Sequence, residues 1–183
     1  MNQGVGGPGP ESKDSEGLLI KDFISVVSFL GRDEFLQRFA HPFLIQLSQE
    51  ENPQDAPGFG TISGNIQKIM VEQELANCRV LKIAKQASNA FSMMVTVGRA
   101  ENNDIIIRNG KVSKFHAYFN ETGSDWFITD GNSSNGTFVN GERLKPGDRT
   151  PIGDNTDLSF SQFLSYRFVL PGSMYEHIQS LKS

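Results

Sequence analysis

The sequence predicts a mainly β protein, an antiparallel β-sandwich of two sheets, and three observations support this fold class. Short apolar runs, several of them alternating with polar residues, recur roughly every ten residues between residues 78 and 170. Turn-forming pairs such as Asn109-Gly110 and Asn140-Gly141 separate some of these runs. The 18 Gly and 14 Phe are typical of a turn-rich protein whose strands face a packed core.

Composition divides the chain into four parts. Residues 1–17 consist mostly of Gly, Pro and charged residues, so we expect a disordered tail. Residues 18–76 are expected to form a helical and irregular extension packed on the sandwich. The sandwich is predicted over residues 77–171, and residues 172–183 are predicted to form a short C-terminal helix.

The predicted extension begins with apolar residues at three- and four-residue spacing, which indicates a helix from Leu18. We expect Gly31 to stop this helix and Asp33 to cap a second short helix that carries Phe39. Residues 43–47 have the composition of a strand. The segment after them is rich in Pro, Gly and acidic residues and predicts a long loop, followed by a weak helical pattern.

The sandwich is expected to contain about nine short strands, with no long helix between them. Two neighbouring pairs of these strands are predicted to be antiparallel hairpins, because a tight turn signal joins them. The expected strands are residues 80–85, 91–97, 104–108, 116–120, 125–130, 137–139, 143–144, 157–161 and 165–170.

Charge and cysteine content exclude several classes of function. The net charge of −4 argues against nucleic acid as the main partner. Cys78 is the single cysteine, so neither an internal disulfide nor a cysteine-based metal site is expected, and no cofactor is predicted. The start of the chain does not have the pattern of a signal peptide, and the apolar run 18–30 is too short to span a bilayer. We therefore expect a soluble, cytoplasmic protein without membrane insertion.

Three polar clusters stand at the ends of predicted strands. They are Gly98-Arg99, Ser113-x-x-His116 and residues 133–137, Ser-Ser-Asn-Gly-Thr. A permanent cation, hydroxyls and a carboxamide on neighbouring loops suit a small, doubly charged anion. The clusters therefore predict an anion-binding site at one end of the sandwich.

The same clusters carry a resemblance to a known family. G-R-x-x-x-N-D from Gly98, V-S-x-x-H-A from Val112 and S-S-N-G-T-F-V-N-G from Ser133 resemble, in this order, the forkhead-associated (FHA) domain. The resemblance covers residues 77–171. It implies an FHA-like sandwich that binds phosphothreonine in partner proteins, with a Ser/Thr kinase or its substrate as the expected partner.

The resemblance also implies roles for individual residues. Arg99, Ser113, Lys114 and Ser134 are expected to bind the phosphate, and Asn135 is expected to hold the main chain of the peptide. Four more residues are expected to structure the loops: Gly98, His116, Gly136 and Thr137, the last by bonding a neighbouring loop backbone. Three further residues are possible peptide contacts: Asn102, Asn132 and Ser133. Asn103 is expected to brace its loop or to touch the peptide.

Gly131 departs from the family pattern, which has an apolar residue there, so the loop from Asp130 to Ser134 is expected to be looser. The residues alone leave simpler interpretations open. Arg99 could form a surface ion pair with Glu101 or Asp104, and Ser113 and Asn135 could serve only the local turns.

The function predicted from these features is a phosphothreonine-dependent interaction module without enzymatic activity. Ser113, His116 and Asp130 are residue types of a hydrolase triad, but the G-x-S-x-G motif of such enzymes is absent from the sequence. The alternative is a phosphate-independent interaction or scaffold module that uses the same sandwich or the N-terminal helices.

Overall fold

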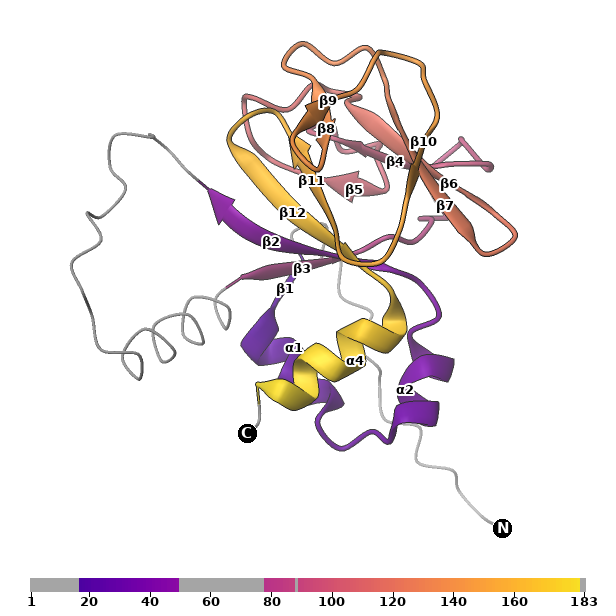
Figure 1. The fold of residues 1–183 in the computed structure, drawn as a ribbon, viewed down its shortest axis with the longest axis vertical. Coiled ribbons are helices and arrows are strands. Elements are labelled where there is room, and N and C mark those ends of the chain that lie inside the picture. Colours follow the sequence, from indigo (N-terminus) through magenta and orange to yellow (C-terminus); the bar gives the residue numbers. More distant parts are fainter. Residues whose placement is uncertain (1–16, 50–77, 88, 182–183) are drawn as a thin grey trace, which may run out of the picture.

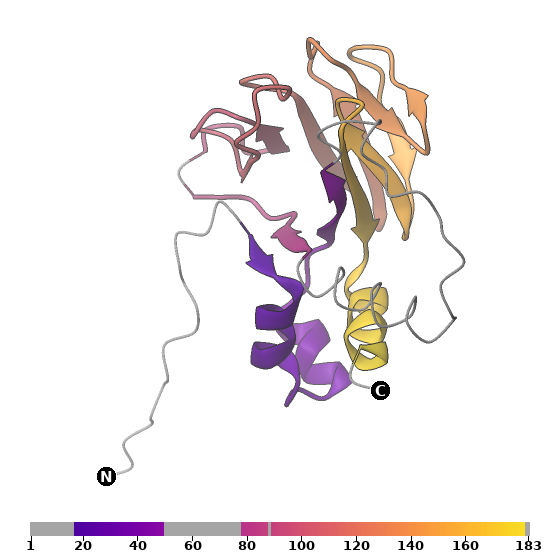
Figure 2. The same ribbon diagram turned by 90° about the vertical axis from the view of Figure 1, so that its left-hand side faces the viewer.

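The computed structural model describes residues 17–49, 78–87 and 89–181. In these residues two β-sheets pack face to face, and three helices gather at one end of the sandwich (Figures 1 and 2). The predicted sandwich of two sheets is therefore confirmed. None of the helices in the described part of the chain has the length and apolarity needed to span a bilayer.

The larger sheet has seven described strands in the order β1-β3-β2-β12-β11-β8-β9, and every neighbouring pair is antiparallel. In this order the strands are β1 (Leu18–Leu19), β3 (Arg79–Lys82), β2 (Phe43–Gln49), β12 (Leu164–Val169), β11 (Thr156–Phe160), β8 (Thr137–Val139) and β9 (Glu142–Arg143).

The smaller sheet has five described strands in the order β10-β7-β6-β4-β5. They are β10 (Thr150–Ile152), β7 (Asp125–Asp130), β6 (Ala117–Thr122), β4 (Val95–Gly98) and β5 (Ile105–Ile106). β4 and β5 pair in parallel, with Val97 opposite Ile105. This sheet is therefore mixed, whereas the sequence predicted only antiparallel pairs. The pair is only two residues long, so alternation carries no signal of its direction.

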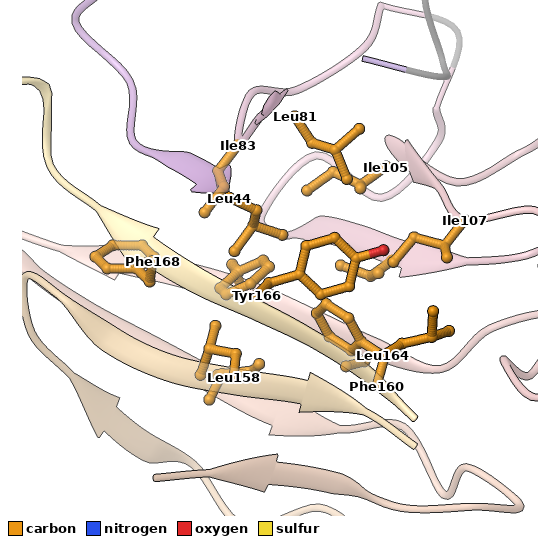
Figure 3. Packing of buried hydrophobic residues seen from close by; sticks show 14 of the residues in the cluster. Leu44, Leu81, Ile83, Ile105, Ile107, Leu158, Phe160, Leu164, Tyr166 and Phe168 are labelled. Atoms are coloured by element: carbon orange, nitrogen blue, oxygen red, sulfur yellow. The ribbon is translucent and has the colours of Figure 1, made fainter. Parts of the chain in front are cut away.

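Alternating side chains explain why these segments form the two facing sheets. In β12, Leu164, Tyr166 and Phe168 are buried, whereas Ser165 and Arg167 between them are partly exposed. The inward-facing residues of both sheets meet in one apolar core, part of which Figure 3 shows around Tyr166 and Phe168. Period-two alternation is the signal that the sequence prediction used.

β2 lies inside the larger sheet, between β3 and β12. It pairs with β12 from Phe43 to Gln49, and Leu44 belongs to the core between the sheets. The strand comes from the predicted extension, residues 18–76, so the sandwich begins before the expected boundary at residue 77. This pairing was not predicted from the sequence, because a long segment separates β2 from β3 along the chain.

The helices α1 (Ile20–Val27), α2 (Arg32–Arg38) and α4 (Pro171–Ser180) cover a second apolar cluster at the end of the larger sheet. Aromatic rings dominate this cluster: Phe23 contacts Phe35, Phe39 and Phe43 with ring centroids 5.3–6.3 Å apart. Gly31 is the N-cap of α2 rather than the end of α1, and Pro171 opens α4, a position that suits its fixed φ.

Several strands differ from the sequence prediction, and β1 occupies the first two residues of the expected helix from Leu18. The strand expected over 91–97 is confined to β4, because residues 91–94 form a turn in which Met94 N–H donates to Phe91 O at 3.4 Å. β10 was missed, since Pro151 at its centre obscures the pattern. The weak helical pattern after the long loop lies outside the described residues, as do residues 1–16 of the expected tail.

Candidate functional site

The three polar clusters come together at the ends of β4 and β7 and in the loop before β6. Arg99 N–H donates to Ser113 O at 2.9 Å, which joins the first cluster to the second. Ser134 N–H donates to Ser113 Oγ at 3.0 Å, which joins the third cluster to the second. Ser113 is therefore the point at which all three loops meet.

Arg99 follows β4 and exposes its side chain to solvent. Both acidic residues that could have neutralised it are engaged elsewhere. Glu101 accepts hydrogen bonds from Arg108 at 3.0 Å on each carboxylate oxygen. Asp104 is buried and accepts hydrogen bonds from Lys85, Gln86, Asn89 and Thr96. Among the described residues, the Arg99 guanidinium thus has no anionic partner, and the ion-pair interpretation of Arg99 does not hold.

Ser113, Lys114 and Ser134 surround the same point. The hydroxyl oxygens of Ser113 and Ser134 lie 3.5 Å apart, at the weak limit of a hydrogen bond, so both hydroxyl protons can turn to a ligand. Lys114 exposes its side chain. Its carbonyl accepts hydrogen bonds from Ala100 N at 3.3 Å and Asn103 Nδ2 at 2.7 Å, which ties Lys114 to the Arg99 loop.

Asn135 is exposed beside these hydroxyls, and its Nδ2 donates to Lys111 O at 2.7 Å. This bond uses one N–H of the side-chain amide. The other N–H and the carbonyl oxygen have no partner among the described residues, so the amide can pair with one peptide group of a ligand.

His116 is fully buried behind the loops and holds two of them. Its Nδ1 accepts a hydrogen bond from Ser113 N at 3.0 Å, so its Nε2 carries the proton and donates to Gly136 O at 3.1 Å. Burial lowers the pKa of His116, which favours the neutral imidazole that these bonds require. Because both ring nitrogens bond to the backbone, Ser113, His116 and Asp130 are not arranged as a hydrolase triad.

Asp130, at the end of β7, organises the loop that carries Asn135. Its buried carboxylate accepts hydrogen bonds from Ser133 N at 3.0 Å, Ser133 Oγ at 2.6 Å and Thr137 Oγ1 at 2.6 Å. Ser133, expected as a possible peptide contact, has a buried side chain that structures the loop. Thr137 likewise bonds a carboxylate and not, as expected, a loop backbone.

Two glycines permit close contacts in the site. A Cβ at Gly98 would lie 2.8 Å from Asn103 Nδ2 and closer still to the carbonyl of Lys114. Gly136 has φ of +84°, which disfavours other residues, and a Cβ there would lie 2.5 Å from Arg143 Nε. Asn103 is buried and braces the Arg99 loop, with Nδ2 donating to Ala100 O at 2.8 Å.

The remaining predicted contacts, Asn102 and Asn132, are exposed on their loops. Gly131 does not loosen its loop in the expected way, because Gly131 N donates to His116 O at 2.8 Å. The absent side chain instead leaves room for the Phe115 ring, whose Cδ1 would lie 2.7 Å from a Cβ at residue 131.

Sequence reasoning missed two residues next to the site: the cation Arg143, and Lys111, whose ammonium lies 5.7 Å from the centroid of the Phe163 ring. Lys111 adjoins Asn135 through the hydrogen bond of its carbonyl, and the Arg143 guanidinium lies against Gly136. Arg143 follows the Asn140-Gly141 turn, so the register of that hairpin was the signal that could have located it opposite Phe138.

Comparison with known proteins agrees with this geometry. Residues 95–161 match the family model of the FHA domain. The matched region contains all three polar clusters, the buried His116 and the Asp130 carboxylate.

Two similar proteins come from Mycobacterium tuberculosis. The ABC transporter ATP-binding/permease protein Rv1747 is 36% identical over 107 residues, which cover 56% of this chain and 11% of Rv1747. The transcriptional regulatory protein EmbR is 30% identical over 105 residues, which cover 57% of this chain and 27% of EmbR. The chain therefore matches only a minor part of each relative.

The chain is also similar to a solved structure, that of Mycobacterium tuberculosis EmbR in complex with a low-affinity phosphopeptide. The similarity covers 49% of this chain and 22% of the EmbR chain. The two share 27% sequence identity, with a TM-score of 0.41.

Proposed function

Because residues 95–161 of this chain form an FHA domain, we propose that the protein is a phosphothreonine-dependent interaction module. It binds an extended phosphopeptide at the loops that carry Arg99, Ser113 and Asn135. The single observation that carries the proposal is the exposed Arg99 guanidinium, for which the described residues supply no anion while Glu101 and Asp104 are engaged elsewhere.

The chemistry of these side chains suits a phosphate monoester. Phosphothreonine carries about −1.5 to −2 charges at pH 7 and three acceptor oxygens. The planar fork of Arg99 can bind two of these oxygens and stays charged at any physiological pH. The hydroxyls of Ser113 and Ser134 and the ammonium of Lys114 supply further donors at the loop junction.

Asn135 gives the site its requirement for a peptide. The free acceptor and donor of its amide match the N–H and C=O groups of an extended main chain. The side chain is held by Lys111 O, so it binds from a fixed position rather than being ordered by the ligand.

The expected partner is a protein that contains phosphothreonine, either a Ser/Thr kinase or a substrate of one. The module itself catalyses no reaction. It brings the phosphorylated partner to whatever the rest of this chain binds. The location of the protein in the cytoplasm stays a prediction.

Binding of phosphopeptides tests the proposal directly. We expect fluorescence anisotropy to detect a phosphothreonine peptide from an oriented library and no binding of its unphosphorylated form. Arg99→Ala should weaken this binding by about 100-fold or more, since it removes at least two charge-assisted hydrogen bonds. Arg99→Lys, which keeps the charge and loses the fork, should give an intermediate affinity.

Arg38→Ala is the matched control, because Arg38 is an exposed arginine at the end of α2. It should bind like the wild type. If no phosphothreonine peptide is retained above the Arg99→Ala background, the proposal fails. A protein partner that binds wild type and Arg99→Ala equally would support the phosphate-independent alternative.

A further inference from the structure

A patch of apolar side chains lies on the outer surface of the smaller sheet, next to the loop of Ser113 and Lys114. We call Phe91, Met93, Phe115 and Tyr118 the aromatic shelf. Phe91 is 51% exposed, Met93 83% and Phe115 36%. The Phe115 ring lies 6.2 Å from that of Phe91 and 6.0 Å from that of Tyr118, which it stacks. Of the four large apolar residues that are exposed in the described chain, Phe91 and Phe115 are in ring contact here, and Met93 lies in the turn that begins at Phe91.

The shelf is held in place from beneath and from the side. Gly131 has no side chain, so the Phe115 ring can lie over its backbone, where a Cβ would be 2.7 Å from Cδ1 of the ring. Asn120 Nδ2 donates to Met93 O at 2.7 Å and fixes the turn that carries Met93. The fixed rings can bind a ligand at a low cost in side-chain entropy.

Hydrogen bonds show where the shelf lies relative to the phosphate site. Along the loop from residue 111 to 116, Asn135 bonds to Lys111, Ser134 bonds to Ser113, and Gly131 bonds to His116 beside Phe115. The phosphate position at Ser113 therefore lies between the main-chain contact at Asn135 and the shelf. Phe115 directly follows Lys114, so the shelf adjoins a residue that is expected to bind the phosphate.

We propose that the aromatic shelf binds an apolar side chain of the phosphopeptide, on the side of the phosphothreonine away from Asn135. The inference rests on the proposed function and names a feature of its ligand. The shelf is continuous with the cationic loop, so the ligand that fits both carries a phosphate and an apolar side chain a few residues apart. Exposed apolar patches of this kind mark binding surfaces, and Met93 can adapt to side chains of different shape.

The test uses the full chain and phosphothreonine peptides in which one position at a time, from −4 to +4, is randomised. The wild type should enrich Leu, Ile, Met or Phe at positions on one side of the phosphothreonine only. A peptide with Leu at the enriched position should then bind about fivefold to tenfold more tightly than the same peptide with Ala.

Phe115→Ala should reduce this preference to about twofold or less while leaving the affinity for the Ala peptide unchanged. Phe91→Ala should reduce it in part. Phe29→Ala is the matched control, because Phe29 is 90% exposed in the turn after α1 and is not part of the shelf. It should keep the full preference.

Two results would overturn the inference while leaving the proposed function intact. The first is that the wild type shows no preference for apolar residues, or that Phe115→Ala keeps the preference of the wild type. The other is self-association of the chain that Phe115→Ala abolishes without a change in peptide preference, which would assign the shelf to a second copy. Loss of all binding above the Arg99→Ala background would instead refute the proposed function.

Discussion

Gly98 permits the end of β4 to lie close to the loop that carries Ser113 and Lys114. A Cβ would meet Asn103 Nδ2 at 2.8 Å and the carbonyl of Lys114, which is backbone and cannot turn away. Gly98→Ala is expected to move Lys114 and the start of the Arg99 loop, and thus to weaken phosphopeptide binding about tenfold or more in an anisotropy titration. Gly110→Ala is the control, because a Cβ there meets nothing within 4 Å. Equal affinities for both variants would contradict this account of Gly98.

His116 couples stability to pH because burial lowers its pKa in the folded protein. The unfolded chain takes up a proton near the ordinary value of 6.5, whereas the folded protein does so only at lower pH. Stability contributed by His116 is therefore complete above pH 6.5 and falls as the pH decreases from 6.5 toward the folded-state pKa. Urea denaturation without ligand at several pH values between 7.5 and about 5 checks this expectation.

His41 contributes in the same direction, since burial lowers its pKa first of all and the nearby charge of Lys82 lowers it further. His41→Gln and His116→Gln should each flatten the pH dependence in part, and the double variant should flatten it most. His177→Gln, at an exposed histidine of α4, serves as the control. A double variant with the pH dependence of the wild type would show that other groups cause it.

At the scale of elements, the helices depend on one aromatic cluster. Phe35 of α2 is fully buried, with its ring 4.8 Å from that of Phe39 and 5.5 Å from that of Tyr175 in α4. Phe35→Ala should lower the free energy of unfolding by about 3–5 kcal/mol, because it removes buried apolar area and leaves a cavity. Phe29→Ala, at a ring that is 90% exposed, should change it by about 0.5 kcal/mol or less.

The elements also show which structural features can be predicted from sequence. β6, in which buried and partly exposed residues alternate, and β7, which follows it after a tight turn, are found where the sequence pattern indicates them. β10 was missed because a proline stands at its centre, and the parallel direction of β5 has no sequence signal in two residues. The pattern of apolar residues in one segment indicates which of its side chains are buried. It does not indicate which other segment pairs with it.

The same distinction applies to the site. Its loops could be located because each motif is contiguous, and the predicted bracing by His116 corresponds to two backbone hydrogen bonds. The burial of Ser133 beneath Asp130 was not predicted, because it depends on which way a short loop folds. Arg143 was also missed, since only the hairpin register brings it to Gly136.

Across the whole molecule, charge is distributed unevenly. The chain carries a net charge of −4, yet cations lie at the loop junction at Arg99, Lys114 and Arg143. Local complementarity can therefore favour a phosphate although the overall field does not attract anions. Because the groups that surround the site are exposed, we expect its affinity to fall as ionic strength rises.

The arrangement of the larger sheet decides how much of the chain the module needs. β2 forms backbone hydrogen bonds with two strands, β3 and β12, and its Leu44 lies in the core between the sheets.

A chain that begins at residue 77 keeps the matched region 95–161 but loses β2, which leaves the edge of β12 unpaired and the core open. We expect this shortened chain to lack a cooperative unfolding transition and to lose phosphopeptide binding. A chain that lacks only residues 1–16 keeps β2 and should retain both. Thermal unfolding followed by circular dichroism compares the two, and a cooperative transition of the shorter chain would show that β2 is dispensable and that the module begins at the boundary that the sequence predicted.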